Sequence, residues 1–206
     1  MRGYEIPAET LVISDEIKKS RFITYIGHKV GLEASRAWWA ELRREHPQAR
    51  HLGWACIAGQ PDDGQQYGFS DDGEPAGTTG KPMLAQLQGC GLGEVTAVVV
   101  RYYGGVLLGT GGLVRAYGGG VARALAQLPR RRVRLLSHFS LFCDYGDLEP
   151  VQWSLRTAQA EVLACDYQER IVWQIACDAE VAPQLAEELA QRTQGRVLLS
   201  AAGEQQ

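Results

Sequence analysis

The residues with the clearest chemical potential are Gly109-Thr110-Gly111-Gly112, directly before a run of helical periodicity that begins at Leu113. The first backbone amides of a helix have no partner within the helix, and glycines allow a phosphate to approach them closely. Arg101 and Arg115 lie before and after this segment and add positive charge. The segment is therefore a candidate anion site. A tight strand-to-helix turn would use the same glycines, but the two arginines favour the site.

Thr78, Thr79 and Lys81 form a second candidate anion site at the start of another predicted helix. The segment resembles a phosphate-binding P-loop, but that motif needs glycine at position 75 and serine or threonine at position 82, and both are proline here. Hydroxyl groups, amides and a lysine at a helix start can still hold an anion. A capped helix with a solvated lysine in its first turn explains these residues equally well.

The densest group of carboxylates consists of Asp71, Asp72 and Glu74. Strand-like alternation would place Asp72 and Glu74 on one face, where they can bind Mg²⁺ if a phosphate supplies further ligands. The same Asp-Asp-Gly pattern also occurs at residues 62–64, where it is plain turn chemistry. We therefore favour a turn over a metal site, and we expect neither a metal nor another cofactor.

Nothing in the chain pairs a nucleophile with a base. His51 and Cys56 lie five residues apart on one predicted strand, and this odd offset sends their side chains to opposite faces. Neither the GxSxG motif of serine hydrolases nor the HExxH motif of zinc peptidases occurs. No catalytic residue is assigned, and the sequence favours a protein that is not an enzyme.

Positive charge gathers at one place that can contact RNA or an acidic partner. Four arginines form this cluster: Arg130, Arg131, Arg132 and Arg134. The segment that follows is acidic, with 4 basic and 10 acidic residues between positions 146 and 206. A cluster of this kind suits nucleic acid or an acidic surface, although a solvated linker is a simpler explanation of the charge alone.

A second basic position is the predicted hairpin turn with Lys18 and Arg21, which can contact phosphates or be merely solvated. Tyrosines also occur close to arginines, at Tyr102, Tyr103 and Tyr117. Tyrosine rings can stack on nucleic-acid bases, but packing in a core is their commoner use.

The elements that position these residues follow from hydrophobic periodicity and turn signals. In the first part of the chain we expect a hairpin over 10–30, a helix from Leu32 to Pro47, a strand over 51–58, a helix over 81–88, a buried strand over 95–102 and a helix over 113–128. Gly118, Gly119 and Gly120 lie inside this last helix. Each glycine destabilises the helix by about 1 kcal/mol relative to alanine. Close packing of the helix on a sheet would offset that cost.

The periodicity of the second part predicts a ferredoxin-like β-α-β-β-α-β order. The expected elements are a strand over 135–143, a helix from about Asp147, strands over 161–166 and 170–177, a helix over 181–189 and a strand over 196–200. The sequence thus divides into a first domain at 1–129, a basic linker at 130–134 and a second domain at 135–206. The fold class is α+β.

Composition limits the class of protein. The chain has 206 residues, of which 45% are hydrophobic and 22% charged, as in ordinary soluble globular proteins. No apolar run has the length of a membrane span, and the first residues lack the apolar core of a signal peptide. Five cysteines show no metal-ligand spacing, which indicates reduced thiols and a cytoplasmic protein without membrane contact.

Three stretches of the chain are distinctive: Lys-Lys-Ser-Arg-Phe-Ile at 18–23, the segment from Phe69 to Leu84 with Asp-Asp-Gly-Glu-Pro-Ala-Gly-Thr-Thr-Gly-Lys, and the segment from Val99 to Tyr117 with Arg-Tyr-Tyr-Gly-Gly and Gly-Thr-Gly-Gly. They resemble signatures of the IMPACT family. The overall layout resembles the bacterial YigZ-like branch of that family, and the resemblance spans nearly the whole chain. Arg50-His51 also matches a position of the family.

The resemblance implies a first domain of the ribosomal-protein domain-2-like α/β sandwich type. The second domain would then be ferredoxin-like and similar to a domain of elongation factor G. Eukaryotic members regulate translation under amino-acid starvation. We therefore expect a translation-linked regulator in the stress response that binds the ribosome, RNA or a translation factor near 71–81 and 101–115, with His51 as a further candidate. The alternative is a phosphate- or nucleotide-binding enzyme, a hydrolase or transferase, that uses Gly109–Gly112.

Overall fold

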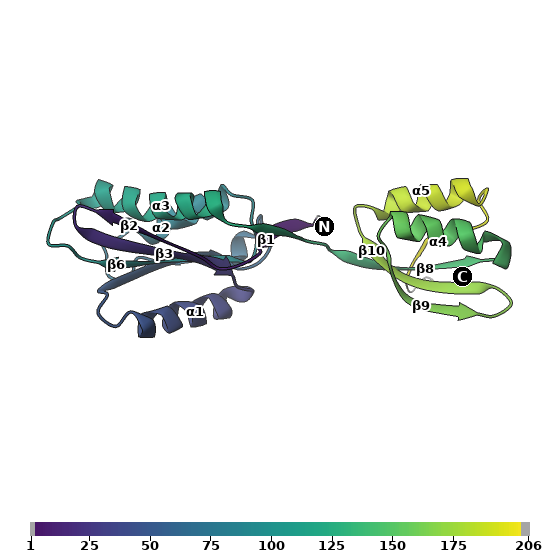
Figure 1. The fold of residues 1–206 in the computed structure, drawn as a ribbon, viewed down its shortest axis with the longest axis horizontal. Coiled ribbons are helices and arrows are strands. Elements are labelled where there is room, and N and C mark those ends of the chain that lie inside the picture. Colours follow the sequence, from purple (N-terminus) through teal and green to yellow (C-terminus); the bar gives the residue numbers. More distant parts are fainter. Residues whose placement is uncertain (1–2, 203–206) are drawn as a thin grey trace. The chain divides into compact units, whose positions relative to one another are not determined.

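The structure, a computed structural model, describes residues 3–202 and divides them into two units, Tyr4–Val133 and the residues from Arg134 onward (Figure 1). The main sheet of the first unit has five antiparallel strands in the order β2-β3-β6-β4-β5. These strands are β2 (Leu11–Ile17), β3 (Ser20–His28), β6 (Val95–Tyr102), β4 (His51–Ile57) and β5 (Tyr67–Ser70).

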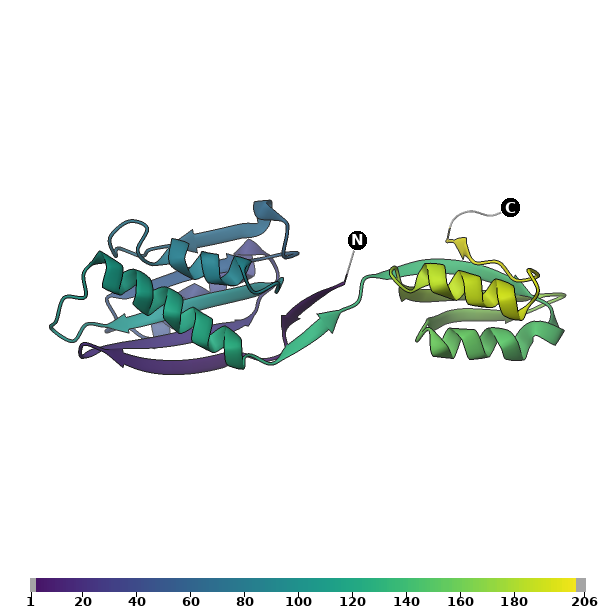
Figure 2. The same cartoon turned by 90° about the horizontal axis from the view of Figure 1, so that it is seen from above.

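Helices cover both faces of this sheet. Helix α1 (Gly31–Glu45) lies on one face, and α2 (Gly80–Gln88) and α3 (Thr110–Gln127) lie on the other (Figures 1 and 2). The side chains of β6 alternate between two cores, with Val99 towards α2 and α3 and Val98 towards α1. Coverage on both faces explains why this strand is continuously apolar, as the sequence predicts.

The predicted hairpin at 10–30 is formed by β2 and β3. Its two-residue turn is Lys18-Lys19, and both residues have positive φ angles of 47° and 64°. Two-residue turns of this hand match the twist of antiparallel strands. Lysines hold positions that glycine or asparagine usually occupies, so the turn projects two cations.

Helix α3 packs on the sheet at a distance that only glycine permits. A Cβ atom on Gly120 would lie 2.7 Å from Oγ1 of Thr24 on β3. On the sheet itself, a Cβ atom on Gly53 of β4 would overlap the side chain of Thr79, which precedes α2. The predicted close packing is therefore confirmed at Gly120, whereas Gly119 is only half-buried.

The basic segment after α3 is a paired strand. Strand β7 (Arg130–Val133) forms an antiparallel ribbon with β1 (Tyr4–Pro7), from the pair Pro7 and Arg130 to the pair Tyr4 and Val133. The sequence predicts a linker at 130–134, and this expectation is corrected up to Val133. The pairing cannot be recognised locally, because the two strands lie more than a hundred residues apart in the chain.

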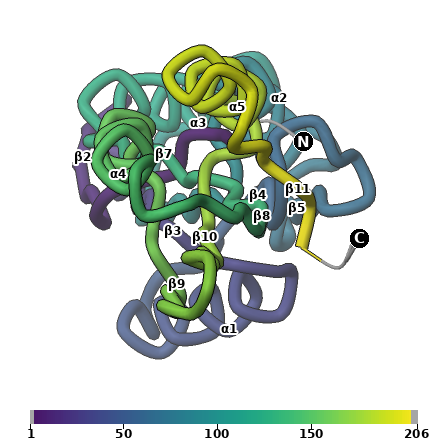
Figure 3. Tube along the Cα trace, turned by 90° about the vertical axis from the view of Figure 1, so that its right-hand side faces the viewer, coloured from purple at the N-terminus to yellow at the C-terminus, as the bar shows by residue number. Residues whose placement is uncertain are grey.

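The second unit has the predicted ferredoxin-like order. It consists of β8 (Leu136–Cys143), α4 (Leu148–Thr157), β9 (Glu161–Tyr167), β10 (Ile171–Asp178), α5 (Ala182–Arg192) and β11 (Ser200–Ala201). The sheet order is β11-β8-β10-β9, and α4 and α5 lie side by side on one face (Figures 1 and 3). The sequence predicts the last strand at 196–200, but residues 196–199 are not a strand, and β11 begins only at Ser200. Two short 3₁₀ turns, Gly64–Gln66 and Tyr145–Asp147, complete the elements of the described residues.

Three further expectations concern what the described part of the chain lacks. All five cysteines are free thiols. Within residues 3–202, no three histidine, cysteine or acidic side chains gather as metal ligands would. No helix in that range is both long and apolar enough to cross a bilayer.

Replacing Gly120 by alanine tests the packing of α3 on the sheet. Alanine favours helix over glycine by about 1 kcal/mol, but the new methyl group would collide with Thr24, and overpacking a core costs about 1–3 kcal/mol. We therefore expect Gly120→Ala to lower the free energy of unfolding, measured by urea denaturation with tryptophan fluorescence.

Gly119→Ala is the matched control, because its methyl group would meet only the flexible end of Arg123. It should leave stability unchanged or raise it slightly. Adding Thr24→Ala to Gly120→Ala should recover the lost stability. If the double variant is no more stable than Gly120→Ala, the contact with Thr24 is not the cause.

Candidate functional site

The loop between β5 and α2 carries the three predicted acidic residues, and Asp71 caps the following helix. Its carboxylate accepts hydrogen bonds from the backbone amides of Gly77 (2.8 Å), Thr79 (3.0 Å) and Gly80 (2.8 Å). Burial acts to raise the pKa of Asp71, but these amides and the nearby Lys81 hold it below its usual value. The chain's own carboxylate thus occupies the amides that we expected to hold an anion.

Thr78 has a structural partner as well. Its hydroxyl group donates to the carbonyl oxygen of Pro75 at 2.7 Å, within the same loop. The expectation of an anion held by Thr78 and the amides at the start of α2 is therefore corrected. Lys81 remains exposed on the first turn of this helix.

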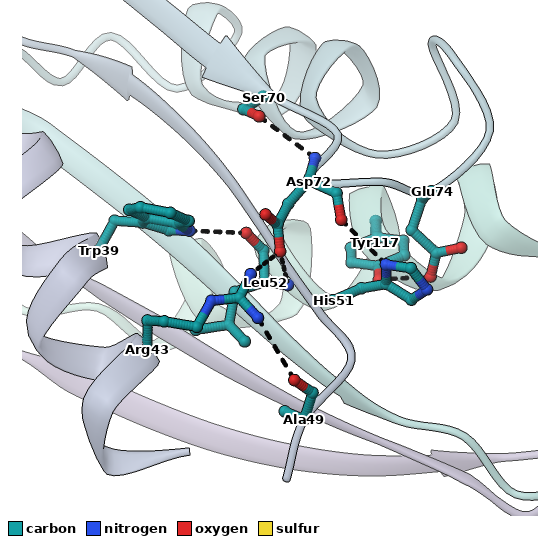
Figure 4. A network of polar contacts seen from close by, with 9 residues as sticks. All are labelled: Trp39, Arg43, Ala49, His51, Leu52, Ser70, Asp72, Glu74 and Tyr117. Carbon is teal, nitrogen blue, oxygen red and sulfur yellow. Dashed lines mark hydrogen bonds and ion pairs between the residues drawn. The ribbon is translucent and has the colours of Figure 1, made fainter. Parts of the chain in front are cut away.

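Asp72 ties the loop to the opposite side of the sheet. Its carboxylate accepts the backbone amide of Leu52 on β4 at 2.7 Å and forms an ion pair with Arg43 of α1 (Figure 4). Its backbone carbonyl accepts a hydrogen bond from Nδ1 of His51 at 2.9 Å. Asp72 itself has a positive φ of 48°, a conformation that these bonds must stabilise.

Glu74 forms the buried centre of the loop. Its Oε1 atom lies 2.6 Å from Nη1 of Arg101 on β6 and 2.8 Å from the hydroxyl oxygen of Tyr117 on α3. The three residues are 8%, 6% and 0% exposed, respectively. Burial and the negative charge of Glu74 raise the pKa of Tyr117, so its hydroxyl group stays protonated and donates.

The three acids therefore do not converge on a metal. Positive φ angles at Asp72 and at Gly73 (80°) reverse the chain between Asp72 and Glu74. Asp72 bonds towards β4 and α1, whereas Glu74 bonds towards β6 and α3. The expectation that alternation places these two carboxylates on one face is wrong, because a turn replaces the extended strand that alternation requires.

His51 lies at the edge of this buried cluster. It is the direct cross-strand neighbour of Arg101 in the β4–β6 register, and Figure 4 shows its ring beside Glu74 and Tyr117. Burial lowers the pKa of His51, and Arg101, Arg50 and Arg43 lower it further against the opposing effect of Glu74. The imidazole is therefore neutral at pH 7.

The hydrogen bond to Asp72 determines the tautomer of His51. A carbonyl oxygen only accepts, so Nδ1 carries the proton and Nε2 keeps its lone pair. No described residue forms a hydrogen bond with Nε2. This atom can accept a hydrogen bond or a proton from a ligand. Cys56 is fully buried, and burial raises the pKa of its thiol, so the predicted lack of pairing with His51 is consistent with its position.

The glycine segment before α3 lies against the β2–β3 turn. The amide of Gly104 donates to Oγ of Ser20 at 3.2 Å, and a Cβ atom on Gly104 would overlap the backbone of Lys19. The predicted candidates Lys18 and Arg21 are exposed at this same end of the unit. Tertiary packing therefore joins the hairpin and the glycine segment, which lie more than eighty residues apart in sequence.

The start of α3 is open. Gly109 has a φ of 74°, and Gly109, Thr110 and Gly111 are exposed, whereas Gly112 is half-buried. Cβ atoms on Gly109 or Gly111 would have no neighbour within 4 Å. Arg115 is exposed one turn further along the helix. Arg101 does not flank this position as expected, because it is buried in the ion pair with Glu74.

The arginine cluster is dispersed by the strand that contains it. Arg130 contacts Glu5 at 3.5 Å and the carbonyl oxygen of Cys90 at 3.4 Å. Arg134 belongs to the second unit, where it donates to the carbonyl oxygen of Gln159 at 3.0 Å. Arg131 and Arg132 are exposed on successive positions of β7, which face opposite sides. These arginines do not form the single patch that their sequence adjacency predicts.

Sequence reasoning missed the roles of two residues that bind the acids of the loop, Tyr117 and Arg43. Tyr117 was expected in the core or on bases, and its hydroxyl partner Glu74 is 43 residues away. Arg43 gave no signal, since a lysine or arginine in the last turn of a helix is usual. Only the pairing of distant segments reveals either role.

Two family models match the chain. The Impact N-terminal domain matches residues 18–125, and a domain of unknown function (DUF1949) matches residues 141–196. The first match contains the whole loop and cluster described above. The second covers most of the ferredoxin-like unit.

Relatives of known sequence match over nearly the full length. An "IMPACT family member" of Haemophilus influenzae is 50% identical over 199 residues, 97% of each chain, and "IMPACT family member YigZ" of Escherichia coli is 50% identical over 201 residues, 98% of each chain. "IMPACT family member YvyE" of Bacillus subtilis is 31% identical and covers 87% of this chain and 82% of its own. A crystal structure titled as that of a hypothetical protein matches with a TM-score of 0.67 and 50% identity over all of both chains.

Replacing Glu74 by glutamine tests the buried ion pair. The substitution keeps the size of the side chain but leaves the guanidinium group of Arg101 buried without a counter-charge. Loss of one partner of a buried pair costs about 3–5 kcal/mol, so Glu74→Gln should lower the free energy of unfolding by about 3 kcal/mol in urea denaturation.

Asp15→Asn is its control, because Asp15 pairs with Arg123 at 2.6 Å in a more exposed position. This loss should stay below about 1 kcal/mol. Equal decreases in the free energy of unfolding of the two variants would show that the buried Glu74 pair contributes no more to stability than the exposed pair.

The lowered pKa of His51 predicts a pH dependence of stability. The unfolded chain takes up a proton at this residue near pH 6.5, whereas the folded chain does so only at lower pH. The stabilising contribution is complete above about pH 6.5 and is lost as the pH falls through the folded pKa. The free energy of unfolding should therefore fall below pH 6.5 less steeply in His51→Gln than in the wild type.

The matched control is His138→Gln, which removes an exposed histidine of the second unit. Its profile should follow that of the wild type. The assignment to His51 fails if both variants change the pH profile to the same extent.

Proposed function

The chain belongs to the IMPACT family, and from this we propose that it is a cytoplasmic, non-enzymatic regulator linked to translation and stress that binds the ribosome, RNA or a translation factor. Ribosomal RNA is the partner for which the first unit is best suited. The observation that carries this proposal is the basic end of that unit, formed by the β2–β3 turn and the glycine segment before α3.

The basic end combines the groups that bind a nucleic-acid backbone. Lys18 and Lys19 project from a tight turn, and neither forms an ion pair with a described residue. The turn packs against Gly104, which leads to the open start of α3. Cations and free helix-end amides both attract phosphates. A rigid turn holds its two lysines at low entropic cost.

Aromatic groups at the same end support binding of RNA rather than of a phosphate alone. The guanidinium group of Arg21 lies 4.6 Å from the centre of the Tyr102 ring, and Tyr103 is 51% exposed. Exposed aromatic rings and arginine planes stack on unpaired bases, which is a common mode of RNA recognition.

The alternative function, a phosphate- or nucleotide-binding enzyme, is favoured by the open start of α3 alone. An enzyme that transfers phosphate needs carboxylates to hold Mg²⁺. The three acids of the segment 69–84 are Asp71, Asp72 and Glu74. They instead form bonds with backbone amides, arginines and a tyrosine. Their engagement supports a binding role, and a nucleotide-dependent rise in melting temperature would support the alternative.

Charge reversal at the hairpin turn tests the proposed function. We expect the wild-type protein to sediment with ribosomes at low salt and to dissociate as salt rises, because phosphate contacts release counterions. Lys18→Glu/Lys19→Glu should reduce the bound fraction at low salt. It should also make the slope of log affinity against log salt shallower, by the amount expected for the loss of about two phosphate contacts.

Arg44→Glu/Arg156→Glu provides the same charge change at exposed positions elsewhere in the two units. This variant should sediment like the wild type. The proposal is wrong if the wild type stays in the supernatant at low salt, or if the two double variants behave alike.

A further inference from the structure

A groove runs between α2 and α3 on the outer face of the first unit. Its volume is about 600 Å³, and it is open to solvent. Pro82 and Ala85 of α2 form one wall, and Val114 of α3 contributes to the other. Gly118 and Gly119 lie between them, and a Cβ atom on Gly118 would be 3.5 Å from Pro82, so the helices are in contact at the floor.

The charged residues of the groove are both cations. Lys81 and Arg115 line it from the two helices, and neither forms an ion pair with a described residue. No aspartate or glutamate lines it. Lys81 helps to lower the pKa of Asp71, but the carboxylate of Asp71 is already bonded to three backbone amides. The lining is otherwise mostly apolar, so the groove combines an apolar floor with two cations.

This combination excludes several ligands on physical grounds. A lone phosphate would leave the apolar walls exposed. Single-stranded RNA needs aromatic rings for stacking, and none lines the groove. A small molecule is usually buried for most of its surface, which an open groove does not provide.

We propose that the groove binds an acidic amphipathic helix of a partner protein. Apolar side chains of such a helix fill the space over Pro82 and Val114, and its carboxylates meet Lys81 and Arg115. Gly119 of the floor is half-buried and has no side chain that would keep the partner helix away. The groove is lined by other residues than the β2–β3 turn, and the proposal does not depend on binding to the ribosome.

The test uses a synthetic helical peptide of about 18 residues, with leucine along one face and glutamate on the other. Its counterpart carries lysine in place of every glutamate. Both are labelled with a fluorophore and titrated with the full chain, and fluorescence anisotropy measures binding. The wild-type protein should bind the acidic peptide and not the basic one.

Two variants locate the binding. Lys81→Glu/Arg115→Glu should lower the affinity for the acidic peptide by about tenfold or more, because two attractive contacts become repulsive. Ala85→Tyr places a large side chain in the groove at an exposed position and should lower this affinity as well. Lys18→Glu/Lys19→Glu is the matched control with the same charge change, and it should bind like the wild type. Thermal unfolding confirms that each variant is folded.

Three outcomes would overturn the proposal: no binding of the acidic peptide, equal binding of both peptides, or an equal loss of affinity in Lys81→Glu/Arg115→Glu and Lys18→Glu/Lys19→Glu. Displacement of the peptide by a single-stranded RNA oligonucleotide would also overturn it and assign the groove to nucleic acid. Sedimentation of Ala85→Tyr with ribosomes should be unchanged, so this proposal and the proposed function can fail separately.

Discussion

The buried ion pair between Glu74 and Arg101 is the interaction on which the first unit depends. It brings together the loop after β5, the end of the central strand β6 and, through Tyr117, the middle of α3. A charged pair at this depth is tolerable only when both partners are present and well bonded, because an isolated buried charge is very costly. The loop, the strand and the helix must therefore be in place together. This coupling makes the cluster a determinant of one unique arrangement.

The two neighbouring acids extend the same principle. Asp71 satisfies the free amides at the start of α2, and Asp72 connects the loop to β4 and α1. Three carboxylates that resemble a catalytic or metal-binding group thus stabilise a loop with three left-handed residues, Asp72, Gly73 and Gly77. The acidic family signature has a structural role here. Among the described residues of this region, His51 keeps an Nε2 atom without a hydrogen-bond partner, and Lys81 is exposed.

Most elements could be predicted from the sequence, because their signals are local. The apolar run of β6 and the helical spacing of α3 can be recognised without knowledge of tertiary contacts. The order of the second unit follows from the change between strand-like and helical periodicity along its sequence. Features that depend on distant partners could not be predicted. The ribbon of β1 and β7 has no alternating pattern on its arginine-rich strand, and the role of Tyr117 appears only once Glu74 faces it. Adjacency along the chain was equally misleading for the four arginines, since successive arginines of β7 face opposite sides and Arg134 belongs to the second unit.

The sequence by itself determined where the unusual backbone lies, which segments are helices and strands, and which family the chain resembles. Local sterics and periodicity decide these properties, and both are present in the residues themselves. Only the tertiary structure decided how the glycines and charges are used. Gly120 allows α3 to pack closely on the sheet, and Gly104 allows close contact with the hairpin turn. Gly109 has a positive φ angle directly before α3. Arg101 became a buried structural residue, whereas Lys18, Lys19, Lys81 and Arg115 remained exposed. Burial, which depends on contacts between distant segments, separates the residues that hold the fold from those that stay exposed to solvent.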